Sequence, residues 1–261
     1  MKKTMETLRA DSLYTDSLVL HGNGKLLDYD DQETGISYRY AQFNTRAVID
    51  CPFRSAGCER VCYATKGNHC FPSVKKSREH SFSESKRNDF ADAMTYTIKV
   101  EKLSKRYKDS VMLIRLHESG DFYSMQYLKK WVKIIGSLDE IDGVKVIFYT
   151  KSFPFFMMLD KSERDILNHA MKTGKLSMNF SLDDTTSIEQ KNAYIKCIAL
   201  YPQANTYYCT EDTETVQHDN TCDCADCAKC GICNNCNGTK TVVKIHSASE
   251  NDMEEYRKNI K

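Results

Sequence analysis

Hydrophobic and polar positions follow two periods along the second half of the chain. Short apolar runs, which are typical of buried strands, occupy residues 111–116, 144–149 and 176–180. Apolar residues at helical spacing follow each run, at residues 123–135, 161–172 and 188–200. Strands that alternate with helices of this length predict βαβ units with right-handed crossovers. The expected fold class is therefore α/β, in which parallel strands form a partial, TIM-like barrel or a sheet.

The first half of the chain has a less regular pattern. One β-like run at residues 17–27 contains Gly-Asn-Gly, which predicts a hairpin turn. Residues 37–50 predict a strand that delivers a cysteine loop (residues 46–78). Residues 79–108 lack Gly and Pro and predict a long amphipathic helix.

These patterns divide the chain into three parts. We expect an N-terminal polar segment with the hairpin at 1–36 and a β/α core that includes the cysteine loop at 37–204. A Cys-rich metal-binding segment at 205–261 should end with a strand at 241–245 and a short charged helix from residue 250.

Polar residues follow each predicted strand of the core. In parallel sheets and barrels the carboxyl ends of the strands share one edge, where ligands bind. We therefore expect His117, Asp121, Lys151 and Asp183 to line one site beside the cysteine loop, with catalytic roles for the first three.

Each of these residues also has a simpler interpretation. His117 can be a satisfied histidine at a strand end, and Asp121 can cap the helix that starts near residue 123. Gly120 can merely supply a tight turn. Lys151 can be a solvated lysine, although its place at the predicted ligand edge favours contact with an anion.

Composition and charge change this picture mainly through the cysteines. The chain has 261 residues, a net charge of +1 and twelve cysteines. No stretch approaches the ~18 apolar residues of a membrane span, and no secretory signal is recognisable, so we expect a cytoplasmic protein without membrane contact. Cysteines in that setting indicate metal or redox chemistry more than disulfides.

Three cysteines gather in the cysteine loop. Cys51, Cys58 and Cys62 would hold a [4Fe–4S] cluster and leave one iron open to a small molecule, because such clusters normally take four cysteine ligands. Cys70 as a fourth ligand would close that iron. A plain zinc site on the same cysteines is the alternative.

Four short motifs follow one another along the chain. They are Cys-Tyr-Ala at 62–64, Phe-Pro-Ser-Val at 71–74 with Arg78, Arg-Leu-His-Glu-Ser-Gly-Asp-Phe at 115–122, and Tyr-Thr-Lys-Ser at 149–152. In this order and spacing they resemble the phage "gene product 88" family. The resemblance covers about residues 44–183, the later Cys-rich segment and His246. It implies a bacteriophage or prophage source, hence the host cytoplasm, and a shared site without a settled reaction.

A looser resemblance is to radical S-adenosylmethionine (SAM) enzymes, whose three-Cys loop also follows the first strand. It implies that Glu118, Ser119, Gly120 and Asp121 approach the SAM amine, and that Asn179, Ser181 or Asp183 approaches its ribose or carboxylate. The cysteine spacing here is C-x6-C-x3-C, which departs from the usual C-x3-C-x2-C.

A second cysteine group occupies the C-terminal part of the chain. From Cys224 onward a cysteine recurs at every third residue, a spacing that suits zinc ribbons and also part of an iron–sulfur ligand run. The family resemblance favours Cys224, Cys227 and Cys230, with Cys209 or His246 completing the ligand set. Zinc and a second Fe–S cluster both remain open for this group.

Two function classes follow. The first is a radical SAM-like iron–sulfur enzyme that uses an electron donor and acts on a small-molecule or nucleotide substrate. The second is a zinc-binding phage accessory protein that binds nucleic acid or a host protein without catalysis. Basic residues at 75–78, 86–87 and 102–108 would serve the second class, but acidic residues interleave them.

Overall fold

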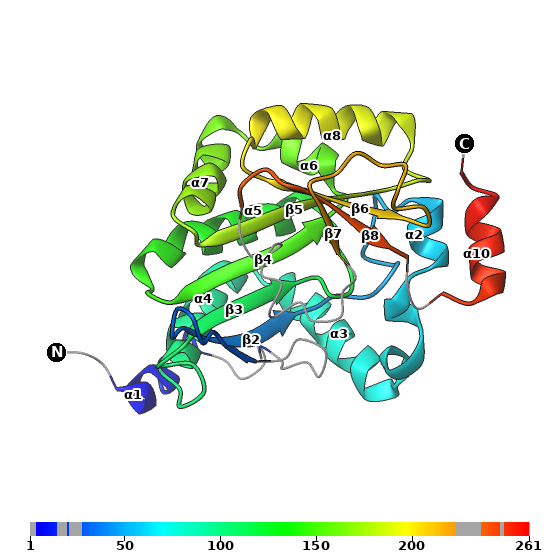
Figure 1. Cartoon of the computed structure of the whole chain (residues 1–261). Helices are drawn as coiled ribbons and strands as arrows, with labels where there is room; N and C mark the ends of the chain where they lie inside the picture. The colour runs from blue at the N-terminus through cyan, green and yellow to red at the C-terminus, as the bar shows by residue number, and fades with distance from the viewer. Residues whose placement is uncertain (1–3, 15–19, 21–27, 223–235, 246–247, 261) are drawn as a thin grey trace.

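The structure is a computed structural model that describes residues 4–14, 20, 28–222, 236–245 and 248–260 (Figure 1). Eight strands form one sheet. They are β1 (Tyr29–Asp30), β2 (Ser37–Phe43), β3 (Val111–Leu116), β4 (Val144–Thr150), β5 (Leu176–Asp183), β6 (Asn205–Thr210), β7 (Asn220–Cys222) and β8 (Lys240–Lys244). Their order is β1-β2-β3-β4-β5-β6-β8-β7, and every pair except β1 with β2 is parallel. The predicted α/β class with a mostly parallel sheet is confirmed.

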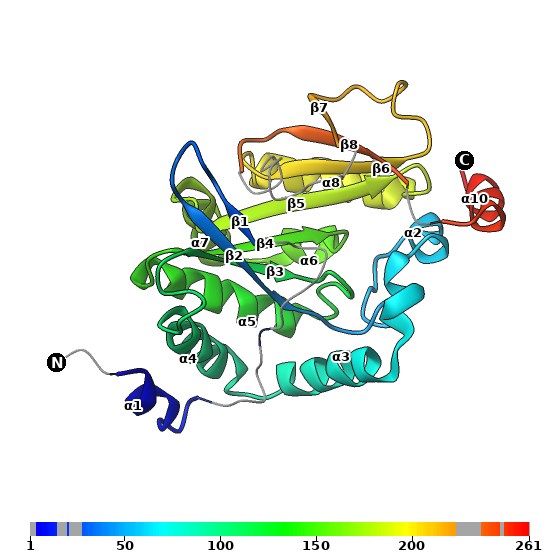
Figure 2. The ribbon, with the colours of Figure 1, turned by 60° about the horizontal axis from the view of Figure 1, so that its bottom comes forward.

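Helices connect the strands of the core, and two more lie before the first strand and after the last. They are α1 (Met5–Arg9), α2 (Ala56–Arg60), α3 (Pro72–Ser85), α4 (Phe90–Lys102), α5 (Met125–Gly136), α6 (Phe153–Met158), α7 (Lys161–Lys172), α8 (Ile188–Leu200) and α10 (Glu250–Arg257). Short 3-10 turns occupy Tyr63–Thr65, Gly67–Cys70 and Ser137–Glu140. Successive right-handed crossovers between neighbouring strands bring the connecting helices to one face of the sheet (Figure 2).

Side chains alternate between the two faces of the sheet. On β3, Met112, Ile114 and Leu116 point into the main core, which they share with residues of α4 to α8. Leu113 and Arg115 point to the opposite face, where the described residues form a small apolar cluster around Tyr40. The rest of that opposite face, which we call the polar face, carries Gln42, Arg115, Tyr149, Ser177, Asn179, Ser181, Asn205 and Tyr207.

Most predicted elements of the core are present, and two differ. The predicted strand at 37–50 ends at Phe43, because residues 47–50 form a turn in which Val48 has a φ of 66°. The predicted helix at 79–108 is two helices, α3 and α4. They are separated at residues 86–89, where Arg87 pairs with both Glu84 and Asp89.

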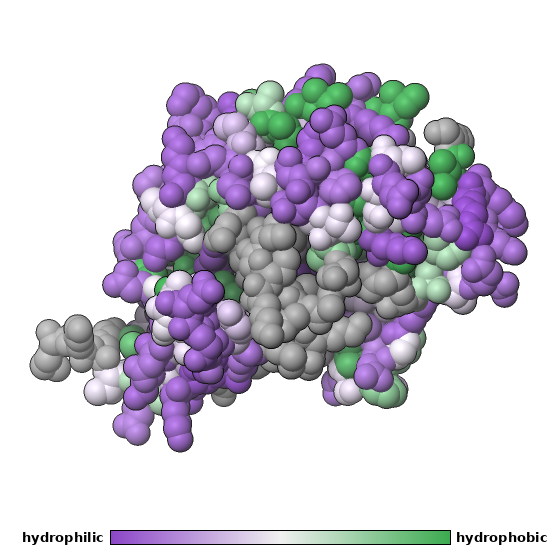
Figure 3. Space-filling model, in the orientation of Figure 1, coloured by the Kyte–Doolittle hydropathy of each residue, from purple (hydrophilic) through white to green (hydrophobic). Residues whose placement is uncertain are grey.

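The ends of the chain add to this core. The predicted hairpin at 17–27 lies outside the described residues, apart from residue 20. Strands β6 and β8 extend the same sheet, and α10 packs on α2 beside the cysteine loop. None of the described helices is long and apolar enough to cross a membrane. The surface in Figure 3 is mainly hydrophilic, with hydrophobic residues gathered over α8, where Ile188 and Ile195 are exposed.

Candidate functional site

The cysteine loop begins with a strained turn at the carboxyl end of β2. Val48 has a positive φ, which is rare for a β-branched residue. Arg46 and the buried Asp50 hold the turn together, with 2.7 Å between Arg46 Nη2 and Asp50 Oδ1. The backbone N–H of Asp121 donates to the carbonyl of Asp50, so the turn is fixed to the segment that follows β3.

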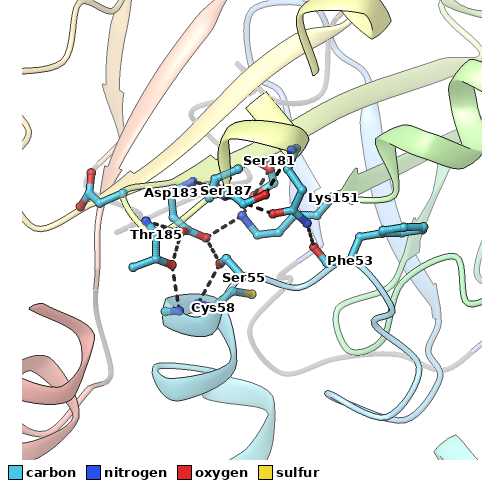
Figure 4. Close-up of polar contacts among 12 residues, drawn as sticks. Phe53, Ser55, Cys58, Lys151, Ser181, Asp183, Thr185 and Ser187 are labelled. Atoms are coloured by element: carbon cyan, nitrogen blue, oxygen red, sulfur yellow. Dashed lines mark hydrogen bonds and ion pairs between the residues drawn. The ribbon is translucent and has the colours of Figure 1, made fainter. Parts of the chain in front are cut away.

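Asp183, at the end of β5, joins the cysteine loop to the sheet (Figure 4). Its Oδ2 accepts a hydrogen bond from Ser55 Oγ at 2.5 Å and lies 2.7 Å from Lys151 Nζ. Its Oδ1 accepts from the backbone and hydroxyl of Thr185. Ser55 is also the N-cap of α2 and accepts from the backbone of Cys58. One carboxylate therefore fixes the helix that carries Cys58.

Lys151 is a buried, paired cation. It is 7% exposed, and its ammonium also donates to the carbonyl of Ser181 at 3.3 Å. Burial alone would lower the pKa of Lys151, but Asp183, Cys58 and Cys209 outweigh burial and raise it. Lys151 thus remains charged, and the solvated interpretation of this lysine is wrong.

The three cysteines of the loop lie close enough to affect one another. Burial raises the pKa of Cys58 to about 11, with further upward contributions from Asp183, Cys62 and Asp121. Burial also raises the pKa of Cys51 and of Cys62. As free thiols they would be protonated and weakly nucleophilic at neutral pH. A metal ligand must also be deprotonated, so metal binding at these cysteines stays a prediction.

Among the described residues, no three His, Cys, Asp or Glu side chains are placed to hold one metal ion. Cys70 is exposed, and its thiol donates to the carbonyl of Thr65. Cys209 lies on β6 directly beside Asp183. The other predicted ligands, Cys224, Cys227, Cys230 and His246, lie outside the described residues.

Asp121 connects two strand ends. Its carboxylate accepts hydrogen bonds from Thr150 Oγ1 and from the backbone N–H groups of Phe122 and Lys151, at 2.7 to 2.9 Å. Burial raises the pKa of Asp121, and these hydrogen bonds oppose the rise. The N-cap of α5 is Ser124, so the alternative that Asp121 caps this helix is wrong.

His117 turns toward the helices. Its φ is 59°, and its Nε2 lies 3.0 Å from the hydroxyl of Tyr127 on α5. Its ring packs edge-on against Phe122, with 4.6 Å between ring centroids. Burial and the nearby Arg115 lower the pKa of His117 to about 3, so the imidazole is neutral. In this orientation it can position the strand end; its catalytic role stays a prediction.

Hydrogen bonds hold the turn after His117 to the cysteine loop and to the segment that follows β2. Ser119 Oγ donates to the carbonyl of Thr45 at 2.6 Å. Tyr63, directly after Cys62, donates through its hydroxyl to the carbonyl of Glu118. Gly120 has a φ of 85° and lies against Thr45, so a close approach of two backbones requires this glycine.

Two further predicted residues belong to the polar face. Asn179 is 1% exposed; its side chain donates to the carbonyl of Phe148 and accepts from Asn205. Ser181 contributes its carbonyl to Lys151. The structure thus brings the groups after β2, β3, β4 and β5 to one end of the sheet, as a parallel arrangement requires.

Four residues of this region had no predicted role. Ser55 could have been found from its place before a short helix, because serine is a preferred N-cap. Tyr63 and Arg78 were noticed only inside motifs, and Arg78 is buried with its guanidinium on the carbonyl of Ala64. The position of Arg115 on the polar face depends on strand register, which no local signal reveals.

Some cations of the basic segments predicted for nucleic-acid binding are engaged in the fold. Arg87 pairs with Glu84 and Asp89, and Arg106 pairs with Asp28. The ammonium of Lys102 donates to backbone carbonyls at the end of α4. Lys75, Lys76, Lys86, Lys105 and Lys108 of the same segments are exposed, so nucleic-acid binding stays a prediction.

The family described as "Gene product 88" matches residues 17–236, which is most of the chain. The chain belongs to the gene product 88 family. The resemblance seen in the motifs is confirmed, and those motifs fall where the cysteine loop meets the ends of β3 and β4.

Two members of the gene product 88 family illustrate the relationship. The "Gene 88 protein" of Mycobacterium phage D29 is 26% identical over 140 residues, which cover 52% of this chain and 52% of that protein. The "Gene 88 protein" of Mycobacterium phage L5 is 30% identical over 92 residues, 33% of this chain and 38% of that protein. The chain spans about half the length or less of these curated relatives. No solved structure gave a significant match.

Proposed function

We propose that this protein is a radical SAM-like iron–sulfur enzyme. The observation that carries the proposal is that three thiols, on Cys51, Cys58 and Cys62, belong to one loop after the carboxyl end of the parallel strand β2 and lie close enough for their charges to act on one another. The hydrogen bonds from Ser55 to Asp183 and from Cys58 to Ser55 fix the segment that carries Cys58. Soft thiolates are the usual ligands of Fe–S clusters. A sheet with sequentially ordered parallel strands supports a partial barrel as the scaffold.

In this proposal the three thiolates hold a [4Fe–4S] cluster with one open iron. The thiols need not converge on one ion, because each thiolate of a cubane binds a different iron. Such a cluster, when bound, supplies one electron for reductive cleavage of SAM. The residues of the chain would hold the cluster and orient SAM. Glu118, Ser119 and Gly120 would contact SAM from the turn after β3, and Lys151 would offset negative charge at the cluster.

The proposal extends to the C-terminal cysteines. Cys209, Cys224, Cys227, Cys230 and His246 would hold zinc or a second cluster. The position of Cys209 beside Asp183 would bring that metal close to the same end of the sheet. The reaction would require an electron donor and a small-molecule or nucleotide substrate in the host cytoplasm.

Anaerobic analysis of iron, sulfide and zinc tests the proposal. We compare wild type with a Cys58→Ala/Cys62→Ala double variant and with Cys197→Ala as the matched control. Cys197 is fully buried in the core, away from the loop. Because the C-terminal cysteines are present in all three proteins, the difference between wild type and the double variant reports on the loop alone.

We expect the double variant to lose about four irons and four sulfides per chain, the content of one cubane, while Cys197→Ala retains them. The electron paramagnetic resonance spectrum of the reduced wild type should change when SAM is added, as an open iron requires. Equal metal content in wild type and the double variant, or zinc without sulfide, would overturn the proposal.

A further inference from the structure

The outer side of α3 carries three lysines without a carboxylate partner. Lys75, Lys76 and Lys86 are exposed, and none of them forms an ion pair with another described residue. Lys75 and the C-cap Lys86 are separated by about three helical turns, so they lie on the same side of α3. At 1.5 Å of rise per residue, about 16 Å along the helix axis separates them.

The two acidic residues of α3 are paired with arginines. Glu79 Oε1 lies 3.3 Å from Nη1 of Arg46, which belongs to the turn before Cys51. Glu84 Oε2 lies 2.9 Å from Nη1 of Arg87. In the sequence these acids alternate with the lysines and seem to balance them. In the structure they contact arginines instead, so the lysines leave an excess of positive charge on this side of the helix.

Two aromatic residues share this side with Lys75 and Lys86. Phe71 precedes Lys75 by four residues; it is the N-cap of α3, and 55% of it is exposed. Phe82 precedes Lys86 by four residues, and its ring packs between two cations. The Cζ of Arg46 lies 3.5 Å from the ring centroid, and the Nζ of Lys86 lies 3.9 Å from it. Phe71 therefore offers an exposed ring at one end of the row of lysines.

This combination fits a single strand of nucleic acid. The length of about 16 Å equals the rise of about five nucleotides in one strand. Proteins that bind single strands place cations along the backbone and aromatic rings under the bases. A membrane surface fits less well, because a helix that lies on a membrane has a wide apolar face. Between Phe71 and Lys86 the exposed residues of α3 are polar, among them Lys76, Glu79 and Ser83.

We propose that the outer side of α3 binds single-stranded nucleic acid. Lys75, Lys76 and Lys86 contact its phosphates, and Phe71 stacks on a base. Arg46 joins this side of α3 to the turn before Cys51, so the bound strand passes beside the cysteine loop. The inference goes beyond the proposed function, because this binding needs no cluster.

Fluorescence anisotropy with a labelled oligothymidylate of about 15 nucleotides tests the inference. The same oligonucleotide in a duplex, polyglutamate, and phosphatidylserine vesicles are the comparison ligands. The full chain is used as wild type and as two triple variants, Lys75→Gln/Lys76→Gln/Lys86→Gln (the α3 variant) and Lys172→Gln/Lys191→Gln/Lys196→Gln (the control variant). The control variant removes the same charge from α7 and α8, which lie away from α3 in Figures 1 and 2.

We expect wild-type affinity to fall as salt rises. Each phosphate contact on a single strand contributes about −0.7 to the slope of log affinity against log salt, so three lysines give a slope of about −2. The α3 variant should bind about tenfold or more weakly at low salt, with a slope near zero. The control variant should keep the wild-type affinity and slope. Phe71→Ala should weaken binding about tenfold and leave the slope unchanged, because it removes stacking and no charge.

The opposite results are equally definite. Absence of wild-type binding, or equal binding by the α3 and control variants, would overturn the inference. Equal affinity for the duplex would overturn the single-stranded class, and equal affinity for polyglutamate or for the vesicles would overturn nucleic acid as the partner. Urea unfolding should be the same in wild type and both triple variants, since the lysines of α3 have no carboxylate partners to lose. A destabilised α3 variant would show a structural role and count against the inference.

The Cys58→Ala/Cys62→Ala variant separates this inference from the proposed function. It should bind the oligonucleotide like wild type, because none of the binding residues is a cysteine. Binding that depends on the lysines in this variant supports the inference whatever the metal analysis shows. A confirmed cluster in a protein whose α3 variant binds normally would leave the proposed function standing and overturn the inference.

Discussion

Two non-glycine residues with left-handed backbone, Val48 and His117, flank the candidate site. Val48 lies just before Cys51, and His117 ends β3. Such conformations cost of order 1–3 kcal/mol each, and they persist where the surrounding structure fixes them. Here the Arg46–Asp50 pair fixes the first, and the contacts of the imidazole with Tyr127 and Phe122 fix the second.

The buried imidazole of His117 makes stability depend on pH. Its pKa is lowered from 6.5 to about 3 in the folded protein, mainly by burial. Between these values the unfolded chain binds more protons, so the free energy of unfolding rises with pH across this window. The contribution is complete above about pH 6.5 and falls by about 1.4 kcal/mol per pH unit below it.

We expect His117→Asn, which tolerates a left-handed backbone, to lose this slope. The measurement is urea unfolding at about pH 7.5 and about pH 5, a range in which the wild type should lose about 1–2 kcal/mol through His117. His169→Asn, on the exposed surface of α7, is the control and should keep the wild-type slope. An unchanged slope in His117→Asn would contradict the assignment.

At the scale of elements, hydrogen bonds tie the turn after β3 to the segment after β2 and to the cysteine loop. Ser119 and Thr45 exchange hydrogen bonds, and Tyr63 reaches the carbonyl of Glu118. Gly120 allows the approach. A Cβ there would lie 2.0 Å from Thr45 Oγ1 and 3.1 Å from the carbonyl carbon of Thr45.

Gly120→Ala should therefore be more destabilising than an ordinary substitution of a left-handed glycine. The matched control is Gly174→Ala, whose φ of 74° is similar but whose Cβ would meet nothing within 4 Å. The control should cost about 1–2 kcal/mol of unfolding free energy. Gly120→Ala should cost at least about 2 kcal/mol more, because Thr45 must move. Equal costs in urea unfolding would show that the turn has room to relax.

At the scale of the whole molecule, contacts distant in sequence hold the cysteine loop in place. Ser55 and Asp183 are 128 positions apart, and so are Gly57 and Thr185. The C-terminal helix α10 adds a third contact. Its Tyr256 is fully buried, donates to Asp184, and packs so closely on α2 that a Cβ at Gly57 would lie 2.3 Å from its ring.

Loss of the Tyr256 ring should remove the packing contact that holds α10 against α2. We expect Tyr256→Ala to cost about 3–5 kcal/mol of docking free energy, the usual range for a buried aromatic side chain. Hydrogen–deuterium exchange should then accelerate in peptides covering α2 and α10. Tyr256→Phe, the matched control, keeps the ring and removes only the hydrogen bonds with Asp184, so its effect should be about 1 kcal/mol. Unchanged exchange in α2 of Tyr256→Ala would show that α10 does not support the loop.

The sequence by itself determined the class of the fold and the family, whereas the metal chemistry of the cysteine loop stays a prediction. Apolar periodicity was sufficient for β3, α7 and α8, because each is long enough to bury one face. The spacing of Cys51, Cys58 and Cys62 and the polar residues after each strand indicated where one site would form. Shorter elements, such as α6 and β6, were missed because so few residues carry little periodic signal.

Only the tertiary structure decided which side chains meet. Lys151 and Asp183 are far apart in sequence, and their ion pair depends on β4 and β5 lying parallel and in register. The same register places Arg115 against Tyr149. Local periodicity reports which face of an element is buried. It does not report which groups on other elements will share that burial, and charge, strain and ligand binding at this site depend on those groups.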